Sequence, residues 1–203
     1  MQELIRRFEK LYPSVECTLE YKEDYQLLFN TRLAAQCTDA RVNIVAKSLY
    51  ARYPTLEAMA EADLEEMKRL VKPCGFYRVK AKDLIQGARI ILADFGGRVP
   101  DTMEDLLKIP GVGRKTANLI LGELFGKPAV VTDTHCIRLA NRLGLCKTKD
   151  PARVEKILQK KIPPEKQLHF CHRLVAHGRA VCNARKPRCE ICGVADLCPS
   201  AKD

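Results

Sequence analysis

Apolar residues recur along the chain at the three- and four-residue spacing that places them on one face of an α-helix. The pattern is clear for residues 42–50, for residues 64–71 and, ahead of Gly96-Gly97, for residues 81–92. The same pattern predicts further helices around residues 23–35, 102–109, 115–125, 134–143, 151–161 and 165–177. No segment shows the apolar–polar alternation typical of a strand, so the sequence predicts an all-α fold.

The breaks between these helices are short. Gly96-Gly97, Lys127-Pro128 and Pro163-Pro164 have the composition of turns, and no low-complexity linker divides the chain. We therefore expect that, if the chain forms two domains, they pack closely against each other.

Composition narrows the class of protein. The chain has 203 residues, of which 46% are hydrophobic, and its 35 Lys and Arg against 25 Asp and Glu give a formal charge of +10. Such an excess favours a polyanionic partner such as a nucleic acid, although a basic protein without one is an alternative. No apolar run approaches the ~18 residues of a membrane span. The N-terminus has no apolar signal core, so we expect a cytoplasmic protein that does not enter a membrane.

The hairpin at residues 102–125 carries the first candidate site. Thr102 and Asp105 have the spacing of a helix start, and the run from Ile109 to Ala117 places two glycines around a valine before the next helix. We expect Gly111 and Gly113 to allow positive φ and close approach of a phosphate to backbone N–H groups, with Arg114 beside them. This is the pattern of a helix–hairpin–helix, which grips the DNA backbone; an ordinary Pro-Gly turn is the alternative.

Two residues after this turn have candidate chemistry. The amine of Lys115, when neutral, is able to attack C1′ of a deoxyribose and hold it as a Schiff base; a phosphate contact is the simpler role. Asp133 precedes a predicted helix, and a helix N-cap is its simplest interpretation. A carboxylate held there is also positioned to assist the lysine or to stabilise positive charge at C1′.

Ten cysteines divide into two groups. Six are scattered through predicted helices, and we expect them to be small buried hydrophobic residues: Cys17, Cys37, Cys74, Cys136, Cys146 and Cys171. The last 22 residues hold the other four, as Cys182-x6-Cys189-x2-Cys192-x5-Cys198. With a single close pair, this spacing favours an iron–sulfur cluster over a four-cysteine zinc site, which stays open as an alternative.

The loop between the first two of these cysteines is basic. Arg185, Lys186 and Arg188 lie within six residues, and we expect them to form a second phosphate-binding patch. A solvated loop is the alternative, because basic loops are common on a basic protein.

Taken together, these motifs resemble the endonuclease III family of helix–hairpin–helix DNA glycosylases, from about residue 25 to residue 198. The resemblance implies that Lys115 is the nucleophile, that Asp133 is its essential partner, and that the four C-terminal cysteines hold a [4Fe–4S] cluster. It also implies a six-helix barrel at residues 18–127 and a cluster domain built from residues 1–17 and 128–203.

The same resemblance assigns two residues that packing alone would explain. Gln36, in the stretch Ala35-Gln36-Cys37-Thr38-Asp39, would fill the gap left when the damaged nucleotide flips out. Phe76, before Tyr77, would wedge the opposite strand. Arg32 departs from the apolar helix of the relatives and is expected near the base pocket, so it bears on which lesions are accepted.

The resemblance implies a bifunctional glycosylase and AP lyase that acts on double-stranded DNA containing an oxidised or ring-saturated pyrimidine or an abasic site. We expect the protein to be monomeric. Two alternatives stay open. One is an adenine or mismatch glycosylase of the same superfamily, which lacks the hairpin lysine and uses a glutamate before the glutamine; no acid occurs from Asn30 to Ala35. The other is a DNA-binding module without catalysis, which the presence of both Lys115 and Asp133 argues against.

Overall fold

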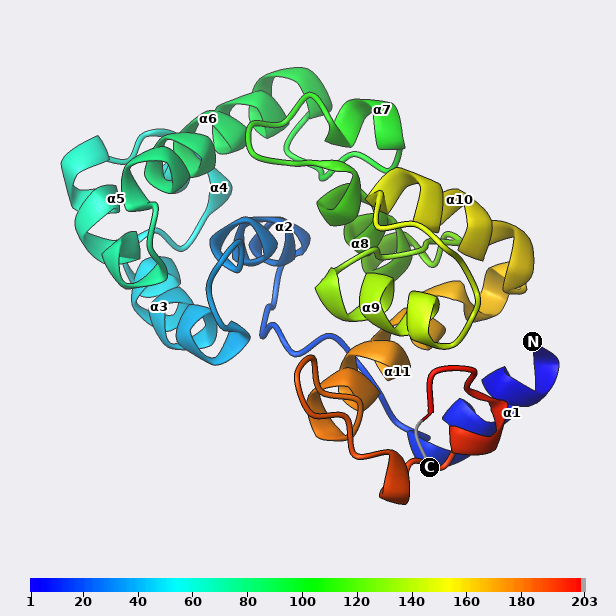
Figure 1. The fold of residues 1–203 in the computed structure, drawn as a ribbon. Coiled ribbons are helices and arrows are strands. Elements are labelled where there is room, and N and C mark those ends of the chain that lie inside the picture. Colours follow the sequence, from blue (N-terminus) through cyan, green and yellow to red (C-terminus); the bar gives the residue numbers. More distant parts are fainter. Residues whose placement is uncertain (202–203) are drawn as a thin grey trace. The chain divides into compact units, whose positions relative to one another are not determined.

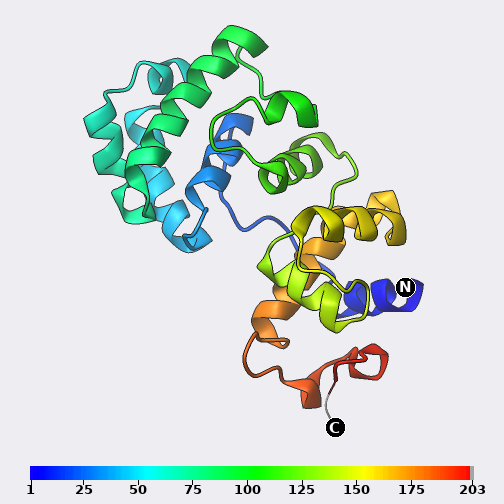
Figure 2. The same ribbon diagram turned by 45° about the horizontal axis from the view of Figure 1, so that its top comes forward.

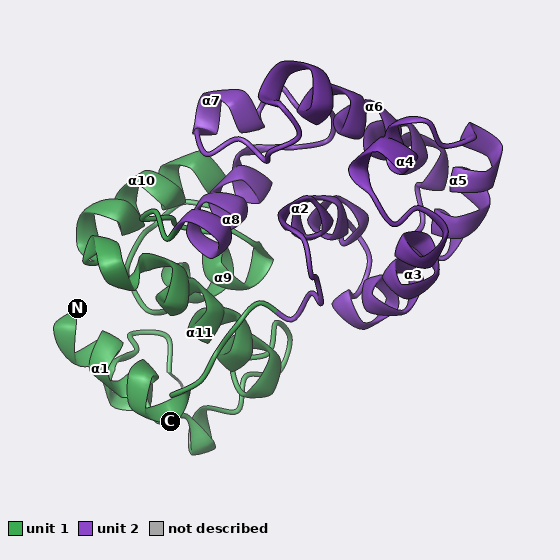
Figure 3. Cartoon of the chain, turned by 180° about the vertical axis from the view of Figure 1, so that it is seen from behind, with its two compact units in different colours: residues 1–17, 126–203 green, residues 18–125 purple. Residues whose placement is uncertain are grey.

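Helices are the regular structure of residues 1–201, the part of the chain that the computed structural model describes, and no strand occurs in this range. The all-α prediction is therefore confirmed. The chain divides into two units (Figure 3). Unit 2 is Thr18–Phe125, and unit 1 combines Met1–Cys17 with the residues from Gly126 onward. Among the described residues, none of the helices has the length and apolar composition needed to span a membrane.

Unit 2 is built around α2, a helix that contacts α3, α6 and α8 (Figure 1). Its Leu27, Leu28 and Leu33 are almost wholly buried. The α-helices of this unit are α2 (Asp24–Leu33), α3 (Asp39–Arg52), α4 (Leu56–Ala60), α5 (Leu64–Val71), α6 (Tyr77–Phe95), α7 (Met103–Leu106) and α8 (Arg114–Phe125), with a 3-10 helix at Lys72–Cys74. Burying both faces of α2 makes it the core helix of the unit.

Side-chain caps start several of these helices. Asp63 Oδ1 accepts from the Glu66 N–H at 2.8 Å, and Thr102 Oγ1 accepts from the Asp105 N–H at 3.1 Å, as their spacing predicts. Within unit 2, the largest differences from the predicted boundaries are an α6 that begins four residues earlier, at Tyr77, and a short α4 that the pattern does not show. A five-residue helix spans too few turns to display periodicity.

Unit 1 joins the two ends of the chain. Its α-helices are α1 (Gln2–Leu11), α9 (Thr134–Arg142), α10 (Pro151–Lys161) and α11 (Gln167–Ala180), with 3-10 helices at Pro164–Lys166, Cys189–Ile191 and Ala195–Leu197. In its core, the ring of Phe8 from α1 packs edge-on against Phe170 of α11, with centroids 5.6 Å apart. Helix α1 also lies beside the C-terminal segment, shown in red in Figures 1 and 2.

The six scattered cysteines do not all behave as expected. Four of them are buried: Cys74, Cys136, Cys146 and Cys171. Cys17 and Cys37 are only half-buried, so the prediction of a core position is wrong for these two. Both lie in irregular segments outside the helices, where a residue is less readily enclosed on all sides.

Candidate functional site

The hairpin turn lies between α7 and α8 and has two dissimilar glycines. Gly111 has a φ of +76°, whereas Gly113 is not among the residues with positive φ, so the expectation of positive φ holds for Gly111 alone. A Cβ built on Gly113 would meet no atom within 4 Å. Val112 between them is 8% exposed, so its side chain points into the protein. The fold itself therefore does not need a glycine at position 113.

An ion pair lies directly against Gly111. Arg32 Nη2 is 2.6 Å from Asp83 Oδ2, and both side chains are mostly buried. A Cβ on Gly111 would lie 2.1 Å from Arg32 Nε and 2.7 Å from Asp83 Oδ2. Arg32, which differs from the apolar residues expected in this helix, thus has an ion-pair partner on α6. The pair supports the turn that is expected to bind phosphate.

Lys115 lies on the first turn of α8, two residues after Gly113. Its side chain is exposed, and Ala117 and Asn118 that follow it are buried. The helix therefore holds the lysine backbone firmly while the amine is open to a ligand.

Asp133 is the N-cap of α9 in unit 1. Its Oδ1 accepts from the Cys136 N–H at 2.7 Å, which confirms the capping interpretation. Val130, Val131 and Thr132 before it are buried. The carboxylate is thus held in place by its hydrogen bond at the start of the helix.

Gln36 and Phe76 share an unusual backbone conformation in unit 2. Their φ values are +56° and +47°, and they are the only non-glycine residues with positive φ among residues 1–201. Gln36 is exposed in the turn after α2, and Phe76 is 63% exposed just before α6. An aromatic side chain so exposed, on a strained backbone, fits a residue that meets a ligand.

The four C-terminal cysteines surround one hollow in unit 1. Cys182, Cys189, Cys192 and Cys198 line a small, partly open hollow, together with apolar side chains that include Leu139 and Val194. Four thiols around a largely apolar hollow are a donor set that fits an iron–sulfur cluster.

Two groups are directed at the sulfurs. Arg142 Nη1 lies 3.2 Å from Cys182 Sγ, and His177 Nε2 lies 3.4 Å from Cys192 Sγ. Burial lowers the pKa of His177, so its ring is neutral near pH 7. If the Tyr12 hydroxyl, 2.9 Å from His177 Nδ1, donates to that nitrogen, Nε2 carries the hydrogen and donates to sulfur. Donors of this kind stabilise thiolate ligands.

Sequence reasoning missed Arg142 and His177. They are 40 and 15 residues from the cysteines they contact, and neither lies in a motif. Only their placement on α9 and α11, beside the cysteine segment, reveals them. A basic residue on each helix is by itself no signal of such a role.

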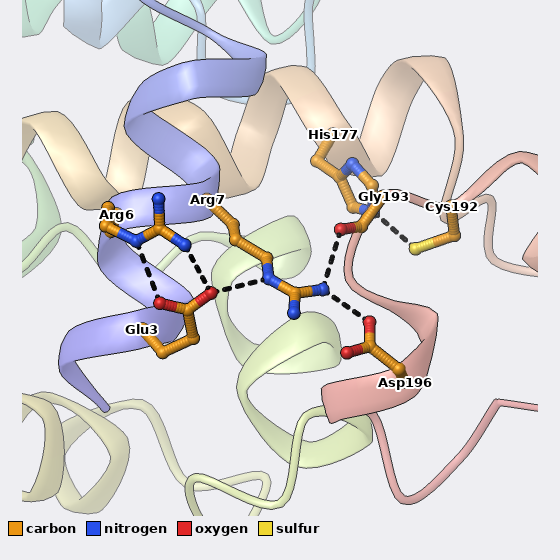
Figure 4. Close-up of polar contacts among 7 residues, drawn as sticks. All are labelled: Glu3, Arg6, Arg7, His177, Cys192, Gly193 and Asp196. Carbon is orange, nitrogen blue, oxygen red and sulfur yellow. Dashed lines mark hydrogen bonds and ion pairs between the residues drawn. The ribbon is translucent and has the colours of Figure 1, made fainter.

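The N-terminal helix braces the cysteine segment (Figure 4). Arg7 Nη1 is 2.5 Å from Asp196 Oδ1 and 3.4 Å from the Gly193 carbonyl oxygen, and Arg7 Nε donates to Glu3 at 2.8 Å. Asp196 is largely exposed, so the ion pair adds little stability on its own. Its effect is to hold the segment between Cys192 and Cys198 in place against α1.

The basic loop at residues 183–188 is held by hydrogen bonds to backbone carbonyl oxygens, and two of its basic side chains are exposed without such a bond. Arg142 donates to the carbonyl oxygens of Asn183 at 2.7 Å and Ala184 at 2.8 Å, and Arg188 donates to the Ala180 carbonyl. Arg185 and Lys186 are exposed, as a phosphate-binding loop requires. Arg188 is also exposed, but its hydrogen bond to Ala180 gives it a structural contact as well.

Comparison with known proteins agrees with these features. Residues 30–164 match the model of the HhH-GPD superfamily base excision DNA repair proteins, and residues 182–198 match that of the iron–sulfur binding domain of endonuclease III. Endonuclease III of Synechocystis is 49% identical over 98% of this chain and 92% of its own length. That of Escherichia coli K12 is 39% identical over 97% and 93%.

The chain belongs to the endonuclease III family. As a member of this family it is a DNA glycosylase with AP lyase activity in base excision repair, and DNA is its partner. It carries a [4Fe–4S] cluster, which the four cysteines around the hollow are suited to hold, so the zinc alternative no longer stands.

Solved structures agree with this family assignment. The fold superimposes on a non-covalent endonuclease III–DNA complex with a TM-score of 0.93, at 37% identity, over 98% of this chain and 94% of the other. A trapped endonuclease III–DNA covalent intermediate matches equally well. A thermostable thymine-DNA glycosylase, 23% identical with a TM-score of 0.88, shares the fold.

Proposed function

We propose that this member of the family acts as a monomer on double-stranded DNA containing an oxidised or ring-saturated pyrimidine or an abasic site, within the cytoplasm. The observation that carries the proposal is the position of Lys115. It is an exposed amine on the first turn of α8, directly after the glycine turn of the hairpin. That a similar protein has been trapped in a covalent intermediate with DNA supports a nucleophile of this kind.

In the proposed reaction, Lys115 Nζ attacks C1′ of the damaged nucleotide. The bond from C1′ to the base breaks, the base leaves with the electron pair and gains a proton, and the attached nitrogen loses a proton. The C1′–O4′ bond of the sugar ring then breaks, O4′ gains a proton, and the nitrogen forms a protonated imine with C1′ of the opened sugar. Loss of a C2′ proton then breaks the C3′–O bond, which nicks the strand. Water finally hydrolyses the imine and restores the amine.

We assign Asp133 the role of assisting this chemistry through its charge. The carboxylate, which is held at the α9 N-terminus, would accept a proton from the amine or stabilise positive charge that develops at C1′. In unit 2 the backbone around Gly111 and Gly113, with Arg114, would bind phosphate.

The other DNA contacts follow from exposure and charge. Gln36 would occupy the space of the flipped nucleotide, and Phe76 would wedge the opposite strand. In unit 1, Arg185, Lys186 and Arg188 would bind phosphate from a loop that begins and ends at cluster ligands.

The test is borohydride trapping. With a duplex that carries a ring-saturated thymine, borohydride should reduce the imine and leave a covalent protein–DNA adduct. Lys115→Gln should give no adduct while binding to the damaged duplex largely survives, since the turn and the basic loop are unchanged.

Each other outcome of the trapping experiment would overturn part of the proposal. Base release by the wild-type protein without an adduct would indicate a monofunctional glycosylase. An adduct that persists in Lys115→Gln would assign the nucleophile to another amine. Neither adduct nor base release on any lesion would indicate a DNA-binding module without catalysis.

A panel of lesions tests the substrate class. We expect cleavage of oxidised and ring-saturated pyrimidines, and activity confined to adenine opposite 8-oxoguanine would overturn the proposal. Arg32→Leu in the same panel tests the expectation that this side chain bears on lesion choice; an unchanged profile would leave Arg32 with its structural contact to Asp83 alone.

A further inference from the structure

Lys80 is a fully buried lysine in unit 2 that the reaction does not use. It lies in the first turns of α6 and has no exposed surface. Its Nζ donates to the carbonyl oxygens of Leu33, Ala35 and Cys74, each at 2.8 Å. Three acceptors use all three hydrogens of an ammonium group, whereas a neutral amine has only two to donate. The side chain is therefore charged, and its charge is balanced by carbonyl dipoles.

The neighbouring Cys74 thiol is not the counter-charge. Burial, together with contact with Cys37, raises the pKa of the Cys74 thiol to about 11. Cys74 is thus neutral near pH 7. Burial lowers the pKa of Lys80 itself, and a buried ammonium persists only because its donors are satisfied. The three carbonyls are consequently what keeps Lys80 in place, and Lys80 keeps them together.

These carbonyls belong to the two turns that present Gln36 and Phe76. Ala35 directly precedes Gln36, and Cys74 precedes Phe76 by two residues. Both turns place a non-glycine residue at positive φ, an unfavourable conformation that persists only where surrounding contacts impose it. Lys80 contacts both turns at the residues just before the strained ones.

We propose that Lys80 is a positioning residue for damage recognition: it ties the Gln36 turn to the Phe76 turn, so that both side chains are presented to the duplex as one preformed unit. This inference rests on the proposed roles of Gln36 and Phe76 in invading the duplex. Without the ammonium, each turn would be free to relax, and ordering both of them would oppose binding at a lesion. Binding to undamaged duplex, which needs neither side chain, should be unaffected.

The test compares affinity for a duplex carrying a tetrahydrofuran abasic-site analogue with affinity for the same duplex undamaged. Lys80→Met keeps the length and apolar stem and removes the charge. We expect the ratio of the two affinities to fall by about tenfold or more, the scale of one charge-assisted hydrogen bond. A 2-aminopurine placed opposite the analogue should show a smaller fluorescence rise on binding, because the base is displaced less.

Arg89→Met is the matched control. Arg89 lies on the same helix, and its Nε donates to the Ala60 carbonyl oxygen at 2.8 Å, between α6 and α4 and away from both turns. Arg89→Met also removes a hydrogen bond from α6 to a backbone carbonyl oxygen, one from an exposed side chain where Lys80 donates three from a buried one, and its affinity ratio should stay that of the wild type. If Lys80→Met does not fold, Lys80→Gln retains an amide donor with shorter reach and should show a smaller loss in the same direction.

Gln36→Ala and Phe76→Ala distinguish the proposed DNA-contacting roles of these two side chains from the positioning role of Lys80. If both retain the wild-type ratio, the proposed roles of these side chains fail, and the inference fails with them. If Gln36→Ala and Phe76→Ala lower the ratio of the two affinities while Lys80→Met or Lys80→Gln leaves it at the wild-type value, Lys80 does not position these side chains. In that case only the inference about Lys80 is overturned. An equal loss in Arg89→Met and Lys80→Met would likewise overturn it, since the effect would then come from the stability of α6.

Discussion

Arg32 and Asp83 form an ion pair that closes directly beneath the glycine turn of the hairpin, with Nη2 of the arginine 2.6 Å from Oδ2 of the aspartate. The two side chains are 17% and 15% exposed, so each would be left in a poorly hydrated place without the other. The pair joins α2 to α6 at the point where Gly111 approaches both.

The first prediction concerns this pair. Arg32→Leu should lower the free energy of unfolding by about 1–3 kcal/mol, because it leaves the Asp83 carboxylate unpaired. Adding Asp83→Asn should recover part of the loss, and a double-mutant cycle from urea unfolding gives the coupling. The exposed pair Lys108–Asp105, in the same unit, should couple by less than about 1 kcal/mol. Equal coupling in both pairs would contradict the importance of burial here.

The two hairpin glycines should respond differently to alanine. Gly111→Ala forces a Cβ onto Arg32 and Asp83 at a positive φ, and should destabilise the protein by roughly 1 kcal/mol or more. Gly113→Ala meets no neighbouring atom and should fold like the wild type, yet bind duplex DNA more weakly because the methyl group obstructs a phosphate. Thermal unfolding and a binding isotherm for each variant decide this. Wild-type affinity in Gly113→Ala would mean that phosphate does not approach this backbone.

Asp133→Asn should separate folding from catalysis. Asparagine caps a helix about as well as aspartate, so the unfolding midpoint should not change, while turnover should fall by roughly a hundredfold or more with the loss of a positioned charge. Asp150→Asn is the matched control, since Asp150 caps α10 in the same unit and accepts from the Arg153 N–H at 2.7 Å. Comparable turnover losses in both variants would show that the effect on turnover is not specific to the Asp133 carboxylate.

Lys186→Glu should weaken binding to duplex DNA regardless of sequence. If Lys186 contacts one phosphate, the slope of log affinity against log salt should become shallower by about one. Lys10→Glu makes the same charge change on α1 and controls for net charge. A slope identical to the wild type in Lys186→Glu, or an equal change in Lys10→Glu, would remove the basic loop from the proposed interface.

The last prediction concerns the cluster. The anaerobically purified protein should be yellow-brown with about four irons per chain. His177→Phe removes Nε2, which lies 3.4 Å from Cys192 Sγ, but keeps a ring against Phe8, so the protein should fold and lose its cluster absorbance about tenfold faster under a chelator. His169→Phe, an exposed position on the same helix, should lose it at the wild-type rate. Equal rates would show that the His177 contact does not stabilise the ligand.

Much of this architecture follows from residues close together in the sequence. Helix starts such as Asp63 and Asp133 depend on a side chain and a backbone N–H three residues later, so the spacing alone predicts them. The hairpin turn and the four C-terminal cysteines are likewise contiguous motifs. For this reason the all-α fold, the family and its cofactor were accessible from the sequence.

Only the tertiary structure reveals the contacts between residues that are far apart in the sequence. Arg32 and Asp83 are 51 residues apart, and Lys80 contacts a carbonyl 47 residues away. No periodicity or spacing predicts such pairs, because they form only when packed helices bring the groups out of water together. The positive φ of Gln36 and Phe76 has the same origin: their sequence gives no preference for it, and the contacts around the two turns impose it.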